Sequence, residues 1–183
     1  MTYVAASNSM IGVADVMSRL NLREGMRVAD LGCGGHGLFT LHVAKLVGPR
    51  GLVYAVDILK STLAELAKKA RLDGASNVKP IWSNLEVAGA TPIPNENVDA
   101  ALVVNVLFQS TDRAALLREA RRIMKPGARL ALVDWQPGAS PFGPPASARL
   151  TPKAAATHAQ AAGFKLLEAF VAGKYHYGLI LTR

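Results

Sequence analysis

A glycine-rich stretch from Asp30 to Gly37 has the residue types and spacing that suit binding of a nucleotide-like ligand. An apolar run ends at Asp30, and glycines at positions 32, 34 and 37 follow directly. Glycine accepts positive φ and lets a ligand approach the backbone, which a β-carbon would prevent. A helix that begins directly after such a turn points its free N–H groups back into the loop. The stretch therefore predicts a strand, a tight turn and a helix that together hold the ligand.

Two acids near this loop bear on which nucleotide-like ligand it holds. The glycine spacing, with Asp57 twenty residues after Gly37, matches the fingerprint of dinucleotide sites. Asp30, however, would place a carboxylate beside a pyrophosphate, which it repels, whereas a ligand with an ammonium group gains from it. The acid therefore favours a ligand that carries an ammonium group, and a dinucleotide stays open as the alternative.

Strands that alternate with helices must position these residues. Apolar runs predict strands at 26–31, 52–56, 78–82, 98–104 and 128–135, and helical periodicity predicts helices at 10–20, 38–47, 60–72, 112–124 and 153–162. Two further strands at 164–171 and 175–182 are joined by a turn near Gly173 and must be antiparallel neighbours. The pattern predicts an α/β fold, a doubly wound, Rossmann-like, mostly parallel sheet with an antiparallel last strand. In such a sheet the ligand lies beyond the carboxyl ends of the strands.

Length and composition fit one domain over residues 1–183, with an N-terminal helical segment at 1–25 and a Pro-rich loop at 136–152. Half of the residues are apolar and 19% are charged, as in globular proteins. A single cysteine, Cys33, excludes a disulfide framework and a multi-cysteine zinc site, so no metal is expected. Neither a signal-peptide pattern nor an apolar stretch of roughly 20 residues is found, which predicts a cytoplasmic protein without a membrane partner.

The net charge of +8 raises the question of a polyanionic partner. Its densest group, Arg118, Arg121, Arg122 and Lys125, follows helical spacing opposite apolar residues, as on the outer face of an amphipathic helix. No aromatic side chains that stack on bases interleave with this group. Nucleic acid is therefore an open but not favoured partner, and the oligomeric state is left open.

Three segments resemble the motifs of class I S-adenosylmethionine-dependent methyltransferases. Val28-Ala29-Asp30-Leu31-Gly32-Cys33-Gly34 resembles the first motif of that family, and Val53-Tyr54-Ala55-Val56-Asp57 resembles its second strand with the ribose-binding acid. Lys125-Pro126-Gly127 resembles the approach to its fifth strand, and the terminal strand pair also matches. The resemblance covers nearly the whole chain and implies a methyltransferase with S-adenosylmethionine as cofactor, similar in layout to quinone-biosynthesis relatives.

The resemblance also implies a cofactor site. Asp30 would orient the amino group of the cofactor, directly or through water, and Asp57 would accept hydrogen bonds from both ribose hydroxyls unless it acts as a helix cap. Asn84 stands at the adenine edge, where the family often has an acid, and His36 stands where the family has a third glycine. His36 therefore either projects toward the ligand or lies exposed in a lengthened turn. The expected cofactor-binding residues are Asp30, Gly32, Cys33, Gly34, Gly37, Asp57, Ile58, Asn84, Leu85 and Asn105.

Methyl transfer needs close placement of the acceptor more than a particular catalytic side chain, so catalytic residues are left unassigned. After the fourth strand the chain reads Asn105-Val106-Leu107-Phe108, without the Asn-Pro-Pro-aromatic motif of enzymes that methylate base amino groups. The substrate candidates are His36, Phe108, Trp135, Tyr175, His176 and Tyr177. This apolar and aromatic set suits a small, partly apolar acceptor.

The last three candidates also have a purely structural interpretation. Tyr175, His176 or Tyr177 would take a proton from the acceptor, or would pack as part of an amphipathic strand. The loop at 136–152 is a candidate lid over the site. Three other functions stay open: an RNA or protein methyltransferase, an NAD-dependent oxidoreductase, and a cofactor-binding protein without catalysis.

Overall fold

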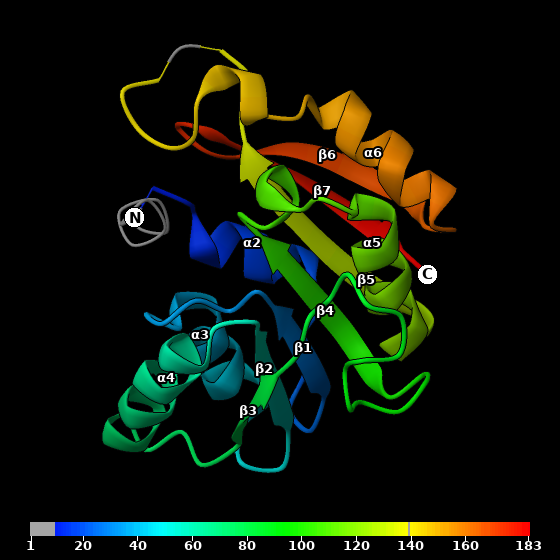
Figure 1. The fold of residues 1–183 in the computed structure, drawn as a ribbon. Helices are drawn as coiled ribbons and strands as arrows, with labels where there is room; N and C mark the ends of the chain where they lie inside the picture. Colours follow the sequence, from blue (N-terminus) through cyan, green and yellow to red (C-terminus); the bar gives the residue numbers. More distant parts are fainter. Residues whose placement is uncertain (1–9, 139) are drawn as a thin grey trace.

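The computed structural model describes residues 10–138 and 140–183, and the seven strands of this part of the chain form one sheet (Figure 1). The strands are β1 (Arg27–Leu31), β2 (Leu52–Asp57), β3 (Val78–Trp82), β4 (Val98–Val104), β5 (Met124–Trp135), β6 (Lys165–Gly173) and β7 (His176–Thr182). Their order across the sheet is β3-β2-β1-β4-β5-β7-β6. The strands β1 to β5 are parallel, and β7 is antiparallel to both β5 and β6. The predicted fold class is confirmed.

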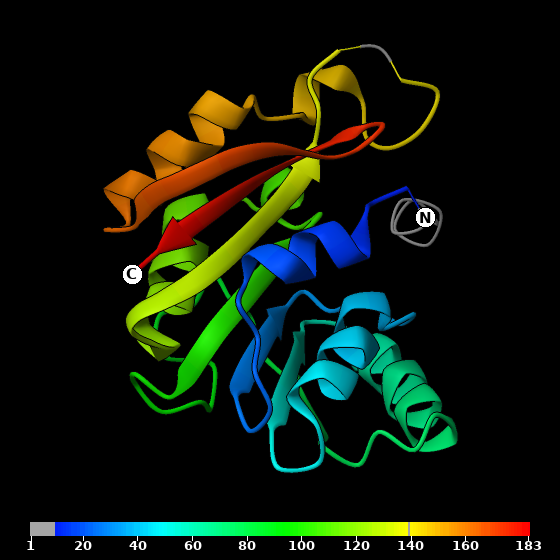
Figure 2. The same cartoon turned by 180° about the vertical axis from the view of Figure 1, so that it is seen from behind.

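Helices cover both faces of this sheet (Figures 1 and 2). They are α2 (Val13–Arg19), α3 (Leu38–Val47), α4 (Lys60–Leu72), α5 (Arg113–Ile123) and α6 (Pro152–Ala161), with 3-10 turns η1 (Leu107–Gln109) and η2 (Ala146–Ala148). Helices α2 and α3 share a buried core with Val28 and Leu102, and Figure 2 shows both in front of the sheet. Helices α5 and α6 form the other core with Leu130 and Leu132. None of the helices in the described residues is long and apolar enough to cross a membrane.

The helices and most strands agree with the sequence prediction to within a few residues, and β5 differs most. It begins at Met124 rather than at 128, because Met124 pairs with Val98 before the register shifts. The shift carries the chain past Pro126, which has no N–H for a ladder, and past Gly127, whose φ is 77°. The Pro-Gly pair therefore lies inside an irregular strand start and does not delay the strand.

The point where the order of the strands reverses lies between β1 and β4. From β1 the chain continues outward to β2 and β3, and it then returns to β4 on the other side of β1. Because all these strands are parallel, the loops at their carboxyl ends open a crevice on one edge of the sheet. The glycine-rich loop, which follows β1, is one wall of that crevice.

Candidate functional site

A cavity of about 500 Å³ lies beyond the carboxyl ends of β1, β2, β3 and β4. This volume is within the range of small-molecule and cofactor sites. Eight of the residues predicted from the sequence line it: Gly32, Gly34, His36, Asp57, Ile58, Asn84, Leu85 and Asn105. These residues lie together because each of their loops follows a parallel strand of the same sheet.

Asp57 ties the glycine-rich loop to the end of β2. Its Oδ2 accepts the N–H of Gly34 at 3.1 Å, and its Oδ1 accepts the N–H of Leu59 at 2.9 Å. The residue at the N-cap of α4 is Leu59, so Asp57 is not itself the cap. A carboxylate oxygen can accept two hydrogen bonds, and each oxygen of Asp57 accepts only one here, so each keeps room for a hydroxyl of a ligand in the cavity.

The glycines of the loop fulfil different structural requirements. A β-carbon on Gly32, whose φ is 83°, would lie 2.3 Å from Cγ2 of Val106, and one on Gly35 would lie 2.4 Å from Oε2 of Glu65. Both of these glycines line the cavity. Gly37 has a φ of 56° and is the N-cap of α3, where a β-carbon would lie 2.2 Å from Cδ1 of Leu66.

Gly37 and Cys33, both expected at the cofactor, do not line the cavity. Gly37 is required by its close approach, at the start of α3, to the side chain of Leu66 on α4. The side chain of Cys33 is buried beside Ala55 and Leu66, and burial raises the pKa of its thiol. Both residues therefore contribute to the packing behind the loop and not to the wall of the cavity.

Asp30 lies directly behind the loop and is only 2% exposed. Its Oδ2 accepts a hydrogen bond of 2.6 Å from Oγ1 of Thr40, in the first turn of α3. Burial, with a smaller contribution from Asp57, raises the pKa of Asp30 to about 6. Asp30 is not among the residues that line the cavity, which favours the water-mediated contact of the two predicted for it.

The rim of the cavity near β2 and β3 is apolar. Ile58 and Leu59 are 53% and 59% exposed, and Trp82 fixes the backbone here by donating its Nε1–H to the carbonyl of Ile58 at 2.8 Å. Leu85 also lines the cavity. The Oδ1 of Asn84, expected at an adenine amino group, already accepts the N–H of Glu86 at 2.9 Å.

Sequence reasoning missed Glu86, whose carboxylate closes one side of the cavity. It accepts hydrogen bonds from Oγ of Ser110 at 2.8 Å and from the N–H of Thr111 at 2.9 Å. These bonds join the chain after β3 to the chain before α5. No local pattern signals them, since the partners are far apart in the sequence. The other lining residues that were not predicted are Gly35, Leu59, Thr62, Glu65, Ser83, Val104, Val106, Gln109, Ser110 and Leu116.

His36 lies at the cavity edge, with its side chain 52% exposed. Its Nδ1 is 3.8 Å from Oε1 of Glu65, and its carbonyl accepts a hydrogen bond from Lys69 of α4. His36 was expected either to face the ligand or to lie exposed, and the structure shows features of both. The side chain faces the cavity and solvent together.

The other five substrate candidates, expected as an aromatic wall, do not line this cavity. Trp135 and Tyr177 are 2% exposed and His176 is fully buried. The rings of Trp135 and His176 lie 4.2 Å apart, and those of Phe142 and Tyr175 lie 5.7 Å apart. Phe108 donates its N–H to Asp134 at 2.9 Å. Two physical reasons apply: the chain after β5 folds back so that Gly143 lies on the Trp135 indole, and Tyr177 projects from the opposite face of the sheet into the core with Leu179 and Leu181.

The sheet order, together with a cavity at the ends of β1, β2 and β4, defines a class I methyltransferase fold. The family described as a methyltransferase domain matches residues 29–132, and the chain belongs to this family. Its relatives include a demethylmenaquinone methyltransferase of Geobacillus stearothermophilus, 34% identical over 62% of this chain and 47% of the relative. A ubiquinone/menaquinone biosynthesis C-methyltransferase, UbiE, of Shewanella frigidimarina is 37% identical over 62% of this chain and 44% of the relative.

These curated relatives are longer proteins, and the chain spans about half of their length. A solved SAM-dependent methyltransferase from Aquifex aeolicus is closer in size. It is 25% identical, with a TM-score of 0.88 over 98% of this chain and 93% of that one. The likeness to this structure therefore extends beyond the 29–132 match to the terminal strands.

Proposed function

We propose that the protein, as a single domain over residues 1–183, transfers a methyl group from S-adenosylmethionine to a small, partly apolar acceptor. The observation that carries the proposal is the cavity at the strand ends, where Asp57, the glycine-rich loop and the apolar rim meet. Family membership and the solved relative from Aquifex aeolicus support the choice of cofactor.

The side chains of the cavity fit this cofactor in shape and chemistry. Both oxygens of Asp57 keep capacity to accept the two ribose hydroxyls. Ile58 and Leu85 offer apolar surface to the adenine ring. The backbone at Gly34 and Gly35 carries no β-carbon, so the sugar and the methionine chain have room beside the loop. Asp30, buried behind the loop, attracts the ammonium group through a bridging water.

The bound cofactor would supply an activated methyl group, and the residues of the chain would place the acceptor in line with it. Such placement alone supplies a large part of the rate enhancement. His36 is the lining residue whose nitrogen is suited to receive a proton from the acceptor. Glu65, 3.8 Å from its Nδ1, is in position to orient the imidazole ring.

The names of two relatives support a small acceptor with an apolar part. They are a demethylmenaquinone methyltransferase and a ubiquinone/menaquinone biosynthesis C-methyltransferase. A cavity of about 500 Å³ suits a cofactor and one small molecule better than a polymer end. Quinone-type rings are therefore the first acceptors to test.

A thermal-shift comparison of S-adenosylmethionine, S-adenosylhomocysteine and NAD tests the proposal. A ligand at about 100 times its Kd stabilises the folded state by about 2.7 kcal/mol. For a chain of this length that corresponds to a Tm increase of roughly 5–10 °C. The proposal expects this increase with the two adenosyl compounds and none with NAD. An increase with NAD alone would favour the oxidoreductase alternative and contradict the proposal.

A further inference from the structure

His176, the first residue of β7, is fully buried, and neither of its ring nitrogens has a hydrogen-bond partner among residues 10–138 and 140–183. Buried polar atoms in native proteins nearly always have a partner, so an unpartnered imidazole needs a physical explanation. Burial, and secondly Arg149, lowers the pKa of His176 to about 4. At neutral pH the ring is therefore uncharged and offers one donor and one acceptor.

The imidazole lies against Trp135, at the end of β5, with ring centroids 4.2 Å apart and planes tilted by 40°. The two residues are directly opposite each other in the antiparallel β5–β7 pair, so their side chains project from the same face of the sheet. Together they present an aromatic surface next to two free polar atoms. This combination suits a ligand that has a flat ring and a hydroxyl group.

The pair lies one step beyond the wall of the cavity. Val104 lines the cavity and is the neighbour of Val133 in the β4–β5 register. Trp135 follows Val133 by two residues and so projects from the same face. A ligand that reaches the Trp135–His176 pair would therefore adjoin the cavity on that face.

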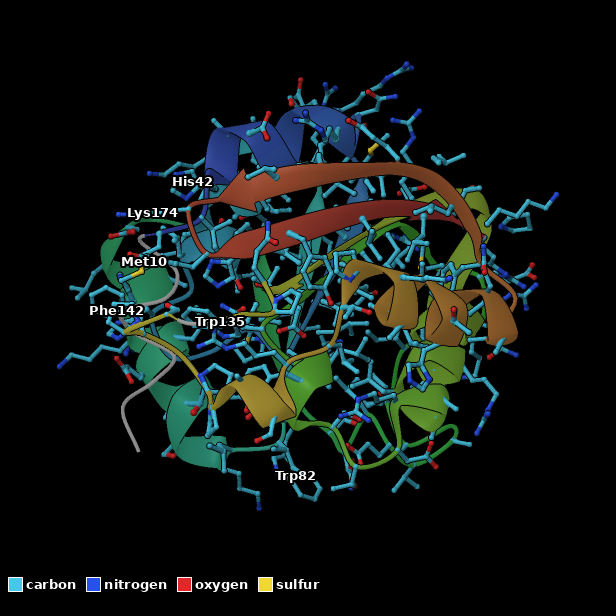
Figure 3. All side chains as sticks on the ribbon, turned by 90° about the horizontal axis from the view of Figure 1, so that it is seen from above. Met10, His42, Trp82, Trp135, Phe142 and Lys174 are labelled. Carbon is cyan, nitrogen blue, oxygen red and sulfur yellow. The ribbon has the colours of Figure 1, made fainter. Side chains whose placement is uncertain are left out.

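A segment of chain covers Trp135, and one side chain holds this segment in place. This cover segment consists of residues 136–138 and 140–149. Gly143 lies on the indole, since a β-carbon there would come within 2.6 Å of Trp135. Figure 3 shows Phe142 and Trp135 on the same side of the molecule, well separated from Trp82.

Arg149 is the residue that holds the cover segment closed. Its guanidinium donates to the carbonyls of Gln136 at 3.3 Å and of Gly138, Phe142 and Pro144, each at 2.9 Å. It also lies over the Trp135 ring, 5.6 Å from the centroid. Because these four hydrogen bonds all come from the Arg149 side chain, a substitution of Arg149 would remove all four from the cover segment together.

We propose that Trp135 and His176 form a closed subsite for the ring and hydroxyl of the methyl acceptor, and that Arg149 is the latch of its lid. The role as acceptor subsite rests on the proposed function. When the cover segment lifts, the indole face becomes free to stack on the ring and the imidazole to bind the hydroxyl. In the closed state the imidazole lacks partners, which favours opening when such a ligand is present.

The first test measures whether Arg149 keeps Trp135 covered. The chain has two tryptophans, so Trp82→Phe leaves Trp135 as the only tryptophan and serves as the background for the quenching variants alone, since Trp82 supports the rim of the cofactor cavity. Acrylamide quenching is then compared for Arg149→Gln and for Arg118→Gln, an exposed arginine on α5. We expect the quenching constant to rise several-fold in Arg149→Gln and to stay constant in Arg118→Gln. Equal quenching in all three proteins would overturn the latch.

The second test measures whether His176 recognises a hydroxyl. Calorimetric titrations use 4-propylphenol and its methyl ether, 4-propylanisole, with Arg149→Gln as the open form. One hydrogen bond corresponds to about a tenfold change in Kd. His176→Phe is expected to weaken binding of the phenol about tenfold and to leave the ether unchanged, and His176→Asn to weaken the phenol less. His42→Phe, on the exposed side of α3, is the matched control. An equal effect of His176→Phe on both compounds, or none on either, would overturn the subsite.

The same variants are also titrated with S-adenosylmethionine, which separates this inference from the proposed function. Loss of phenol discrimination with normal S-adenosylmethionine binding would overturn the subsite alone. Discrimination by His176 in a protein that does not bind S-adenosylmethionine would support the ring and hydroxyl site but overturn its role in methyl transfer.

Discussion

Substitution of Gly37 by alanine should destabilise the protein without affecting its ligand. Gly37 has a φ of 56°, and an added β-carbon would lie 2.2 Å from Cδ1 of Leu66, which is fully buried. The left-handed backbone conformation of a non-glycine residue costs about 1–2 kcal/mol. Overpacking of a buried side chain adds about 1–3 kcal/mol. The expected loss in the free energy of unfolding is therefore about 2–5 kcal/mol.

Gly74 provides a matched control for this prediction. Its φ is 69°, and no atom lies within 4 Å of an added β-carbon, so Gly74→Ala carries the backbone term alone, about 1–2 kcal/mol. Urea denaturation of the two variants isolates the packing contribution as their difference. In the double variant Gly37→Ala/Leu66→Val the shorter side chain should recover part of the loss, although Leu66→Val alone is destabilising. Calorimetry should find the same affinity for S-adenosylmethionine in Gly37→Ala as in the parent protein.

Two outcomes would refute this reasoning. Equal losses in Gly37→Ala and Gly74→Ala would show that the contact with Leu66 contributes nothing. A large decrease in S-adenosylmethionine affinity in Gly37→Ala, with unchanged stability, would place Gly37 at the cofactor after all. That result would restore the role implied by the family motif.

Two further predictions concern buried carboxylates. Burial alone would raise the pKa of Glu119, but hydrogen bonds from Arg122 and from the N–H groups of Gly89 and Thr91 hold this pKa at about 2. The ionised carboxylate therefore stabilises the fold above pH 4.5, and this stabilisation is lost as the pH falls toward 2. Glu119→Gln should therefore unfold in urea with about 2–3 kcal/mol less stability at pH 7, and the same deficit at pH 2.5 would contradict the assignment. Burial raises the pKa of Asp134 to about 7. Between pH 4 and pH 7 the native state therefore binds more protons than the unfolded state, and the stability that protonated Asp134 contributes is lost as the pH rises through this range. Asp134→Asn should remove this dependence, gaining roughly 3–4 kcal/mol relative to the parent between pH 4 and pH 7, whereas parallel stability curves would disprove it.

The sequence predicted the helices and strands of the fold, including the antiparallel terminal pair, because their signals are local. The helix from Leu38 was placed correctly, since a glycine at the N-cap and helical periodicity both mark its start. The start of β5 was placed too late, because Pro126-Gly127 is a strong local break. Its pairing partner on β4, which decides where the strand begins, is distant in the sequence.

The candidate site shows the same division between local and distant information. Asp57 and Asn84 were found because each ends or follows a parallel strand, and that alone places them at the cavity. Glu86 was missed because its role comes from partners on the chain before α5. The burial of Trp135 could not be predicted either, since it depends on Gly143 and on a cover segment held by hydrogen bonds from Arg149, for which no sequence pattern exists.

The measurement that tests the account most directly is calorimetric titration of S-adenosylmethionine into the parent protein, Asp57→Ala, Asp57→Asn and Asp73→Ala. Asp73 follows the end of α4 and is exposed, so it serves as the control. Each hydrogen bond to a charged carboxylate contributes about 1.5–3 kcal/mol, so losing two should weaken binding about 100-fold or more. We predict one binding site in the parent protein and in Asp73→Ala, severe loss in Asp57→Ala and an intermediate affinity in Asp57→Asn. Absence of binding to the parent protein, or equal affinity in Asp57→Ala, would contradict the proposed cofactor site.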